Sequence, residues 1–409
     1  MEIEDIKKLI IKKESVNDPN RHLNHIEYQD NSNYCPPKYD VPIDDEGYLQ
    51  SFTINQENEY LKFFNHYGFV IIRDVLNDQQ CQASIDDIWN FILKEQWRTE
   101  PVNSTNDSES EKVKQDQPET WVKSWPTSHQ VGFLGSRSVF SKTAVETRAN
   151  PNIYRVYSTL LGRNDLFINH DRYGFFRPTK NILNPMPKMT PHHTEIKQRL
   201  GEMNAVKIES KNDWKTIFNV HLDLNPFEFL EETSDETRQK IIQKLEYENS
   251  MSNDFQLENN EVGPKTLNEL HIQGLLNFAD NKTSDGGFLV VPGFPNHFEE
   301  WAKKYGFIKT IKLDIIFDTK ILSLKKYAVR VTARAGSLVL WNQKMAHGSS
   351  PNDSSYPRFS QFIKVSVSTY FNQEKTQLRC NKIKEALNDL DKEQFTDLQQ
   401  KIIGLKSWI

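Results

Sequence analysis

The sequence of 409 residues has few cysteines, no long apolar run and no excess of basic residues. Its three cysteines, Cys35, Cys81 and Cys380, lie far apart and form no CxxC pair, which excludes a zinc ribbon and a dense disulfide framework. No run reaches the ~18 apolar residues of a membrane span, and the amino-terminal segment lacks the apolar core of a secretion signal. These absences predict a cytoplasmic protein without a membrane span.

The charge balance does not favour a nucleic-acid partner. The chain has 51 lysines and arginines against 56 aspartates and glutamates, a formal net charge of -5. Nucleic-acid-binding proteins usually carry a basic patch or stripe. Because 37% of the residues are hydrophobic, there is ample material for a core, and we expect a globular protein that does not bind nucleic acid.

The composition along the chain predicts an arm, one large domain and two helical additions. Residues 1–50 are polar and interrupted by prolines, as expected of an extended arm on the domain surface. Residues 51–409 are expected to form one domain, with a polar inserted segment at about 226–267 and a helical tail at about 382–409. The stretch 101–120 has almost no apolar residues and predicts a mobile loop, because burial cannot offset its ordering entropy.

Short apolar runs separated by turn residues predict a mainly β fold with flanking helices. Two amphipathic helices are expected near the start of the domain, one from residue 55 and one over 77–93. The runs expected to be strands are 67–72, 166–176, 216–224, 270–278, 287–291, 328–332, 337–341 and 359–370. Their spacing favours a sandwich or barrel over a sheet of alternating strands and helices.

The first candidate metal ligands are His221 and Asp223. On a strand, residues two apart share a face and lie about 6.5 Å apart, so both side chains can reach one metal ion. The β-branched and aromatic residues before His221 support a strand there. The bare pattern is weak evidence, because it also occurs in His25-Ile26-Glu27, His193-Thr194-Glu195 and His297-Phe298-Glu299.

The second candidate cluster pairs His347 with Arg358. A predicted strand ends, a turn presents His347, and eleven residues later Arg358 opens the next strand. There the guanidinium shares a face with Ser360 and Phe362 and can bind a carboxylate through two parallel hydrogen bonds. Together with the first pair, this cluster offers two imidazoles and one carboxylate to Fe(II), leaving three positions for a 2-oxo acid and O2.

With these motifs the sequence resembles the phytanoyl-CoA dioxygenase-like family of Fe(II)/2-oxoglutarate-dependent oxygenases. The resemblance covers about residues 55–409, except for the inserted segment. Its further motifs are Tyr67-Gly68-Phe69-Val70-Ile71, His221-Leu222-Asp223-Leu224-Asn225-Pro226, Ile272-Gln273-Gly274-Leu275-Leu276, Gly286-Gly287-Phe288-Leu289-Val290-Val291-Pro292-Gly293-Phe294 and Arg334-Ala335-Gly336-Ser337.

The resemblance implies a double-stranded β-helix, a jelly-roll of two antiparallel sheets with iron at its open end. It implies His221, Asp223 and His347 as Fe(II) ligands. It also implies that Arg358 and Ser349 anchor the distal carboxylate of 2-oxoglutarate and that Gln273 contacts this co-substrate. The expected enzyme uses O2 to hydroxylate a small-molecule or lipid-like substrate and releases succinate and CO2.

Three alternatives stay open at this point. The chain could be an inactive β-helix binding module, against which the retention of every iron and 2-oxoglutarate element argues. It could also be a cupin-like metalloenzyme that does not use 2-oxoglutarate, which would have no reason to keep Arg358. His193 and Glu195 are a competing ligand pair, preceded by a further histidine, His192. They lack the β-branched run before them and the Leu-Asn-Pro sequel that follows Asp223.

Overall fold

The computed structural model describes residues 36–94, 112–122, 125–126, 132–135, 138–193, 206–208, 210–223, 270–305, 323–368 and 373–408. The predicted inserted segment at 226–267 and residues 1–35 of the predicted arm lie outside the described residues. All elements named below belong to one unit, Tyr34–Ile409. None of the helices in the described part of the chain has the length and apolar character that a membrane crossing requires.

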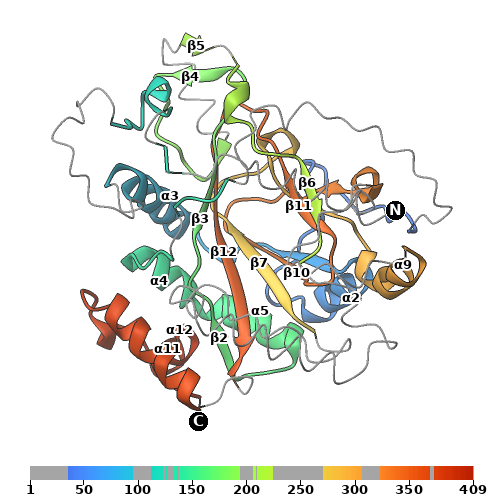
Figure 1. The fold of residues 1–409 in the computed structure, drawn as a ribbon, viewed down its shortest axis with the longest axis vertical. Helices are drawn as coiled ribbons and strands as arrows, with labels where there is room; N and C mark the ends of the chain where they lie inside the picture. The colour runs from blue at the N-terminus through green and yellow to red at the C-terminus, as the bar shows by residue number, and fades with distance from the viewer. Residues whose placement is uncertain are drawn as a thin grey trace, which may run out of the picture. The chain divides into compact units, whose positions relative to one another are not determined.

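The strands form two main antiparallel sheets, and from β6 onward the chain passes back and forth between them. The larger sheet has the order β1-β10-β7-β12-β2, with β3 also paired to β12, and the smaller has the order β6-β11-β8-β9 (Figure 1). Their bounds are β1 Phe69–Ile72, β2 Leu166–Ile168, β3 Tyr173–Phe176, β6 Asn219–His221, β7 Ile272–Asn277, β8 Gly287–Val290, β9 Val329–Arg330, β10 Ser337–Asn342, β11 His347–Ser350 and β12 Arg358–Val367. A separate ladder pairs β4 Ile182–Asn184 with β5 Val206–Ile208.

The order in which the strands enter the sheets identifies the architecture. β6 lies in the smaller sheet, β7 in the larger, the paired strands β8 and β9 in the smaller, β10 in the larger, β11 in the smaller and β12 in the larger. This alternation is the double-stranded β-helix, and it confirms the predicted fold class of a mainly β protein with flanking helices.

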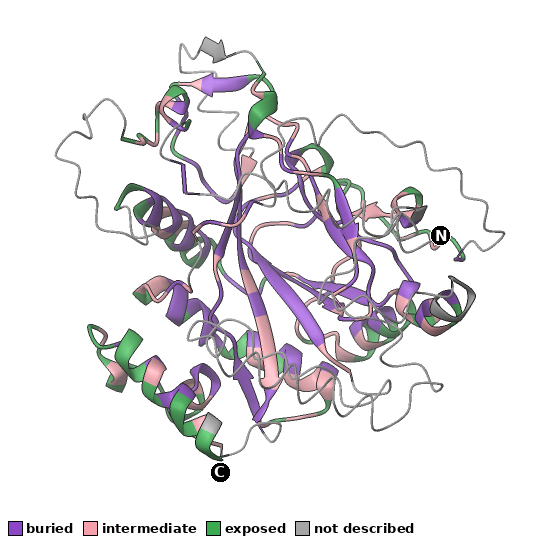
Figure 2. Cartoon of the chain, viewed as in Figure 1, coloured by how far each residue is buried: buried purple, intermediate pink, exposed green. Residues whose placement is uncertain are grey.

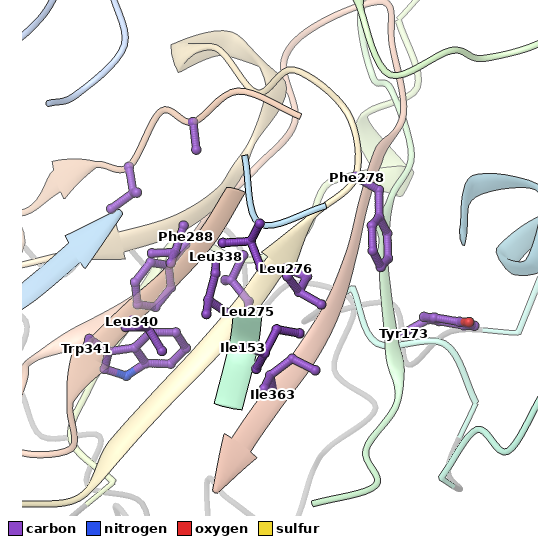
Figure 3. Packing of buried hydrophobic residues seen from close by; sticks show 14 of the residues in the cluster. Ile153, Tyr173, Leu275, Leu276, Phe278, Phe288, Leu338, Leu340, Trp341 and Ile363 are labelled. Carbon is purple, nitrogen blue, oxygen red and sulfur yellow. The ribbon is translucent and has the colours of Figure 1, made fainter. Parts of the chain in front are cut away.

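The outer face of the larger sheet is covered by helices. Phe359 of β12 lies against Trp89 of α3 (Asp78–Leu93), with ring centroids 6.4 Å apart. Tyr157 of α5 (Pro151–Leu161) donates a hydrogen bond to the carbonyl of Ile363 at 2.9 Å. Both sheets are largely buried, as Figure 2 shows, and Figure 3 shows side chains of β7, β10, β12 and α5 in the hydrophobic cluster. The inner face of the sheet is therefore left to face the smaller sheet.

The two helices expected near the start of the domain are confirmed. α2 (Glu57–Tyr67) buries Tyr60, Phe63 and Phe64, the residues at helical spacing in the sequence. α3 begins with a capping box, in which Asn77 and Gln80 satisfy each other's backbone N–H groups. Local sequence signals were sufficient here because caps and amphipathic spacing act over one or two turns.

The run 166–176, predicted as one strand, is two strands, β2 and β3. Between them the side chain of Asp171 accepts a hydrogen bond from the backbone N–H of Arg172 at 2.7 Å. The Nε2 atom of His170 is hydrogen-bonded to the carbonyl of Ile403 at 2.9 Å. These side-chain bonds lie in the break between the two strands, both of which pair with β12.

His347 directly follows a turn at 343–346, as predicted, but it is also the first residue of strand β11, which was not predicted. That strand contains no β-branched or aromatic residue, so the sequence carried no strand signal. It is a strand because its backbone pairs with β6 on one side and with β8 on the other. Gly348 permits the close approach, since a Cβ atom there would lie 2.0 Å from the carbonyl oxygen of Asn219.

The expectation of a mobile loop over 101–120 is wrong for residues 112–120; residues 101–111 lie outside the described residues. The segment contains the 3-10 turn Pro118–Thr120, and it ends at Trp121, which is fully buried. The indole Nε1 of Trp121 donates to the carbonyl of Lys114 at 2.7 Å. Burial of this one large side chain orders a segment that is otherwise polar.

The carboxy-terminal tail begins before the predicted boundary and is not one helix. It consists of α11 (Gln373–Ala386), the 3-10 turn Lys392–Gln394 and α12 (Asp397–Ile403), which packs against β2. Within the arm, the described residues 36–50 include the buried Tyr48 and Leu49. The N–H of Leu49 donates to Oγ1 of Thr332 at 2.9 Å, so this part of the arm packs beside β9.

Candidate metal centre

Two neighbouring strands of the smaller sheet bring His221 and His347 together. The two residues are direct partners in the pairing of β6 with β11, and their ring centroids are 4.4 Å apart. Asp223 follows His221 by two residues and returns to the same side, while the intervening Leu222 is buried in the core. The strand period therefore places the carboxylate beside the two imidazoles, as the sequence predicts.

The distances among these three side chains suit a single metal ion. Nε2 of His221 lies 3.3 Å from Oδ1 of Asp223, and Nε2 of His347 lies 3.6 Å from Oδ2. One ligand atom from each residue lies within 4.8 Å of the others. An octahedral ion with bonds of about 2.1 Å has adjacent ligands about 3 Å apart, so small movements would close the cluster on an ion.

The protonation states also suit a metal. Nδ1 of His347 lies 2.8 Å from the carbonyl of Met345, which leaves Nε2 to face Asp223. Burial, together with the neighbouring His221, lowers the pKa of His347 to about 4, so its imidazole is neutral at pH 7. Burial alone would raise the pKa of Asp223, but the imidazoles of His347 and His221 hold that pKa well below its usual value. Two imidazoles and one carboxylate form the donor set that Fe(II) oxygenases use.

Gln273, expected to contact the co-substrate, lies against a predicted ligand. Its Nε2 donates to Oδ2 of Asp223 at 2.6 Å, and its Oε1 accepts from Nε1 of Trp341 at 2.8 Å. A contact between Gln273 and the co-substrate stays a prediction. The hydrogen bonds show that Gln273 belongs to the same site as the three clustered residues.

One side of the cluster is an aromatic wall formed by Trp341 and Phe288. Their ring centroids are 4.1 Å apart, and Trp341 and Phe288 lie 5.4 Å and 5.9 Å from the ring of His347. Figure 3 shows the two rings side by side, Trp341 from β10 and Phe288 from β8. The wall keeps water from this side of His347 and strengthens charge interactions within the site. Sequence reasoning missed both residues as part of the site.

Arg358 opens β12, as predicted, and is only 5% exposed. Its Nη1 donates to Oγ of Ser360 at 3.4 Å, whereas its Nε is buried without a hydrogen-bond partner. Burial lowers the pKa of Arg358 to about 10, which leaves the guanidinium charged at pH 7. A buried cation with an unused N–H is suited to a carboxylate ligand. Gly287 makes the room, because a Cβ atom there would lie 2.4 Å from Nε of Arg358.

Ser349, the second predicted carboxylate anchor, follows His347 by two residues on β11. Its backbone N–H donates to Oδ1 of Asn219 at 2.8 Å. Asn219 precedes His221 by two residues on β6, so strand alternation places both on one face of the smaller sheet. Sequence reasoning did not single out Asn219, although the same period-two argument that selected Asp223 would have found it.

The competing histidines have other partners. His193 lies 3.7 Å from Asp285 and stacks on Tyr356, with ring centroids 4.7 Å apart. His192 lies between two carboxylates, 3.3 Å from Asp280 and 3.1 Å from Asp78. Glu195 lies outside the described residues.

The bare motif that begins at His297 does not join the cluster either. The Nε2 atom of His297 is hydrogen-bonded to the hydroxyl of Tyr39 at 3.0 Å. The motif that begins at His25 lies outside the described residues. Within the part of the chain that the structure describes, His221, Asp223 and His347 form the one group of three or more His, Cys, Asp or Glu side chains that could hold a metal ion.

Comparison with known proteins finds a relative by sequence and a solved structure of similar fold, with lower similarity to other structures. A Dictyostelium discoideum protein named as a phytanoyl-CoA dioxygenase is 32% identical over 390 residues, covering 90% of this chain and 98% of that protein. The crystal structure of the GlcNAc-inducible gene 2 protein from Candida albicans has a TM-score of 0.51 at 12% identity, covering 87% of this chain and 79% of that chain. EctD from S. alaskensis, crystallised with 2-oxoglutarate and 5-hydroxyectoine, has a TM-score of 0.38 at 14% identity and covers 76% of each chain. No family model matches the sequence.

Proposed function

Because the chain belongs to the phytanoyl-CoA dioxygenase family, we propose that it is an Fe(II)- and 2-oxoglutarate-dependent dioxygenase whose iron ligands are His221, Asp223 and His347. The observation that carries the proposal is the convergence of these side chains, with ligand atoms within 4.8 Å of one another. The neutral imidazole of His347 and the ionised carboxylate of Asp223 can bind Fe(II) without first losing a proton at pH 7. The substrate that we propose is a small-molecule or lipid-like compound, hydroxylated at a C–H bond.

The protein contributes ligation, orientation and exclusion of water. His347 presents Nε2 because its Nδ1 faces the carbonyl of Met345. Arg358 offers a buried guanidinium to the distal carboxylate of 2-oxoglutarate, and the hydroxyl of Ser349 is the proposed second donor. The bound iron and 2-oxoglutarate supply the oxidation of the substrate by O2, with release of succinate and CO2.

A single anaerobic measurement tests this function against its rivals. The metal-free protein is titrated with Fe(II) and 2-oxoglutarate while the visible charge-transfer absorption is recorded, and succinate is measured after O2 is added. We expect both the band and succinate. A band without succinate under a broad substrate screen would indicate a binding module. If neither the band nor succinate is observed, the protein is either a cupin-like enzyme or a protein without this chemistry.

We also propose a cytoplasmic location. Cys81 and Cys380 are both free and buried in the structure. Free thiols are typical of proteins in reducing compartments, where disulfides are rare. Fractionation of cells that produce the full chain tests the location, and recovery with secreted proteins would contradict it.

A further inference from the structure

Two hydrogen bonds connect Trp341 to Asp223 through the amide of Gln273. The indole Nε1 of Trp341 donates to Oε1 of Gln273 at 2.8 Å, and Nε2 of Gln273 donates to Oδ2 of Asp223 at 2.6 Å. Trp341 and Gln273 are direct partners in the pairing of β10 with β7, and each is only 4% exposed. The larger sheet thus contacts the candidate metal site on the smaller sheet through these two hydrogen bonds.

The direction of the amide follows from the chemistry of its neighbours. An indole N–H can only donate, so the atom of Gln273 that faces Trp341 must be the carbonyl oxygen. An ionised carboxylate can only accept, so the atom that faces Asp223 must be the amide nitrogen. Both contacts require the same orientation, and a rotated amide would lose both bonds. Trp341 therefore fixes Gln273 as a donor toward Asp223.

The bond falls on one of the two carboxylate oxygens. Gln273 binds Oδ2, which also lies 3.6 Å from Nε2 of His347, while Oδ1 lies 3.3 Å from Nε2 of His221. A carboxylate can bind a metal ion through one oxygen or through both. If Asp223 used both, the protein would fill four positions of an octahedral ion and leave two. A chelating 2-oxo acid and O2 together need three.

We propose that Gln273 is a positioning residue that keeps Asp223 a one-oxygen ligand by holding Oδ2, an inference that rests on the proposed function. The hydrogen bond is charge-assisted and buried, which makes it shorter and stronger than a neutral one. Gln273 need not touch the metal or the co-substrate for this role. Its effect is to preserve the third open position and to orient the carboxylate before the metal arrives.

The test compares Gln273→Met with the wild-type protein. Methionine has similar length and volume but donates no hydrogen bond. Binding of Co(II) to the metal-free protein is measured by calorimetry, and the visible absorption of bound Co(II) reports the number of ligand atoms. We expect affinity to fall by about 10- to 100-fold, as for other residues that support a metal ligand, with a changed Co(II) spectrum. We also expect the Fe(II)-loaded variant to need more 2-oxoglutarate for the charge-transfer band.

Two further variants separate positioning from stability. Gln400→Met on α12 removes a hydrogen bond of 2.8 Å to the carbonyl of Phe395, and since α12 packs against β2 it should leave Co(II) binding unchanged. Trp341→Phe removes the donor that orients Gln273 together with part of the indole beside His347, and it should weaken Co(II) binding less than Gln273→Met does. If Gln273→Met does not fold, Trp341→Phe decides the matter by the same spectrum.

The outcomes distinguish this inference from the proposed function. Wild-type Co(II) affinity and spectrum in folded Gln273→Met, or in Trp341→Phe when the former is unfolded, would overturn the positioning role. If the wild-type protein itself gives no charge-transfer band with Fe(II) and 2-oxoglutarate, the proposed function fails first. A variant that loses Co(II) affinity while the wild type gives the band supports both.

Discussion

His347 lies directly opposite His221 in the antiparallel pairing of β11 with β6, and the two imidazole centroids are 4.4 Å apart. Because side chains alternate along a strand, a slip of one residue would turn one imidazole to the other face of the sheet. The separation of the rings therefore depends on the register of two strands far apart in the sequence. Metal affinity is the measurable consequence of that register.

Replacing any one of His221, Asp223 or His347 by alanine should abolish succinate formation and weaken Fe(II) binding more than about 100-fold, a larger loss than for supporting residues. Two remaining protein ligands cannot fix the ion on one face of its coordination sphere. Anaerobic Fe(II) titration and circular dichroism of each variant check the prediction, and the fold should be retained. Normal Fe(II) affinity in Asp223→Ala together with its loss in Glu195→Ala would favour the competing histidine motif.

Arg358→Ala should raise the 2-oxoglutarate concentration needed for the charge-transfer band. Removing one partner of a buried charged pair costs about 2 to 5 kcal/mol, which corresponds to at least about 30-fold in affinity. Arg358→Lys should restore little, because an ammonium has the charge without the planar pair of donors. Arg155→Ala, which changes a surface arginine paired with Glu57, is the control. An unchanged 2-oxoglutarate requirement in Arg358→Ala would assign the carboxylate to another residue.

Gly348→Ala tests the approach of β11 to β6. The new Cβ atom would lie 2.0 Å from the carbonyl oxygen of Asn219, so the strands must separate. We expect a loss of about 1 to 3 kcal/mol in unfolding free energy and a clear fall in Co(II) affinity. Gly162→Ala strains a turn with a φ of +62° where no other atom lies within 4 Å, so it should affect stability alone. Equal Co(II) affinity in Gly348→Ala and wild type would show that the register tolerates the separation.

His170 should make the protein less stable as the pH falls below about 6.5. Burial, with the nearby Arg148 and Arg379, holds the pKa of His170 well below 6.5. Above pH 6.5 both folded and unfolded states carry a neutral imidazole, so the group gives no pH dependence. Below it only the unfolded state takes up the proton, and stability falls by about 1.4 kcal/mol per pH unit until the folded pKa is reached.

Urea unfolding between about pH 7.5 and pH 5 measures this slope. His170→Asn should be less stable at neutral pH, because Nε2 of His170 bonds the carbonyl of Ile403 at 2.9 Å, but its stability should fall less steeply with acid. His66→Asn, at an exposed histidine, is the control. Identical slopes in wild type and His170→Asn would mean that other groups cause the acid sensitivity.

The sequence by itself determined the features that depend on short-range periodicity. His221 and Asp223 share a side because side chains on a strand alternate, whatever the strand pairs with. The capping residues of α3 and the apolar spacing of α2 are similarly local. Arg358 could be placed at the start of a strand because the residues after it have high β propensity.

Only the tertiary structure decided which distant residues complete the site. β11 is a strand because β6 and β8 pair with it, not because His347 and its neighbours favour one. Gln273 meets Asp223, and Trp341 orients Gln273, because β7 pairs with β10 while its inner face meets the other sheet. Hydrogen bonds between strands join residues far apart in the chain, so no local pattern carries their register. The ligand pair His221 and Asp223 could therefore be predicted from the sequence, whereas the hydrogen bonds from Gln273 and Trp341 that hold Asp223 in place could not.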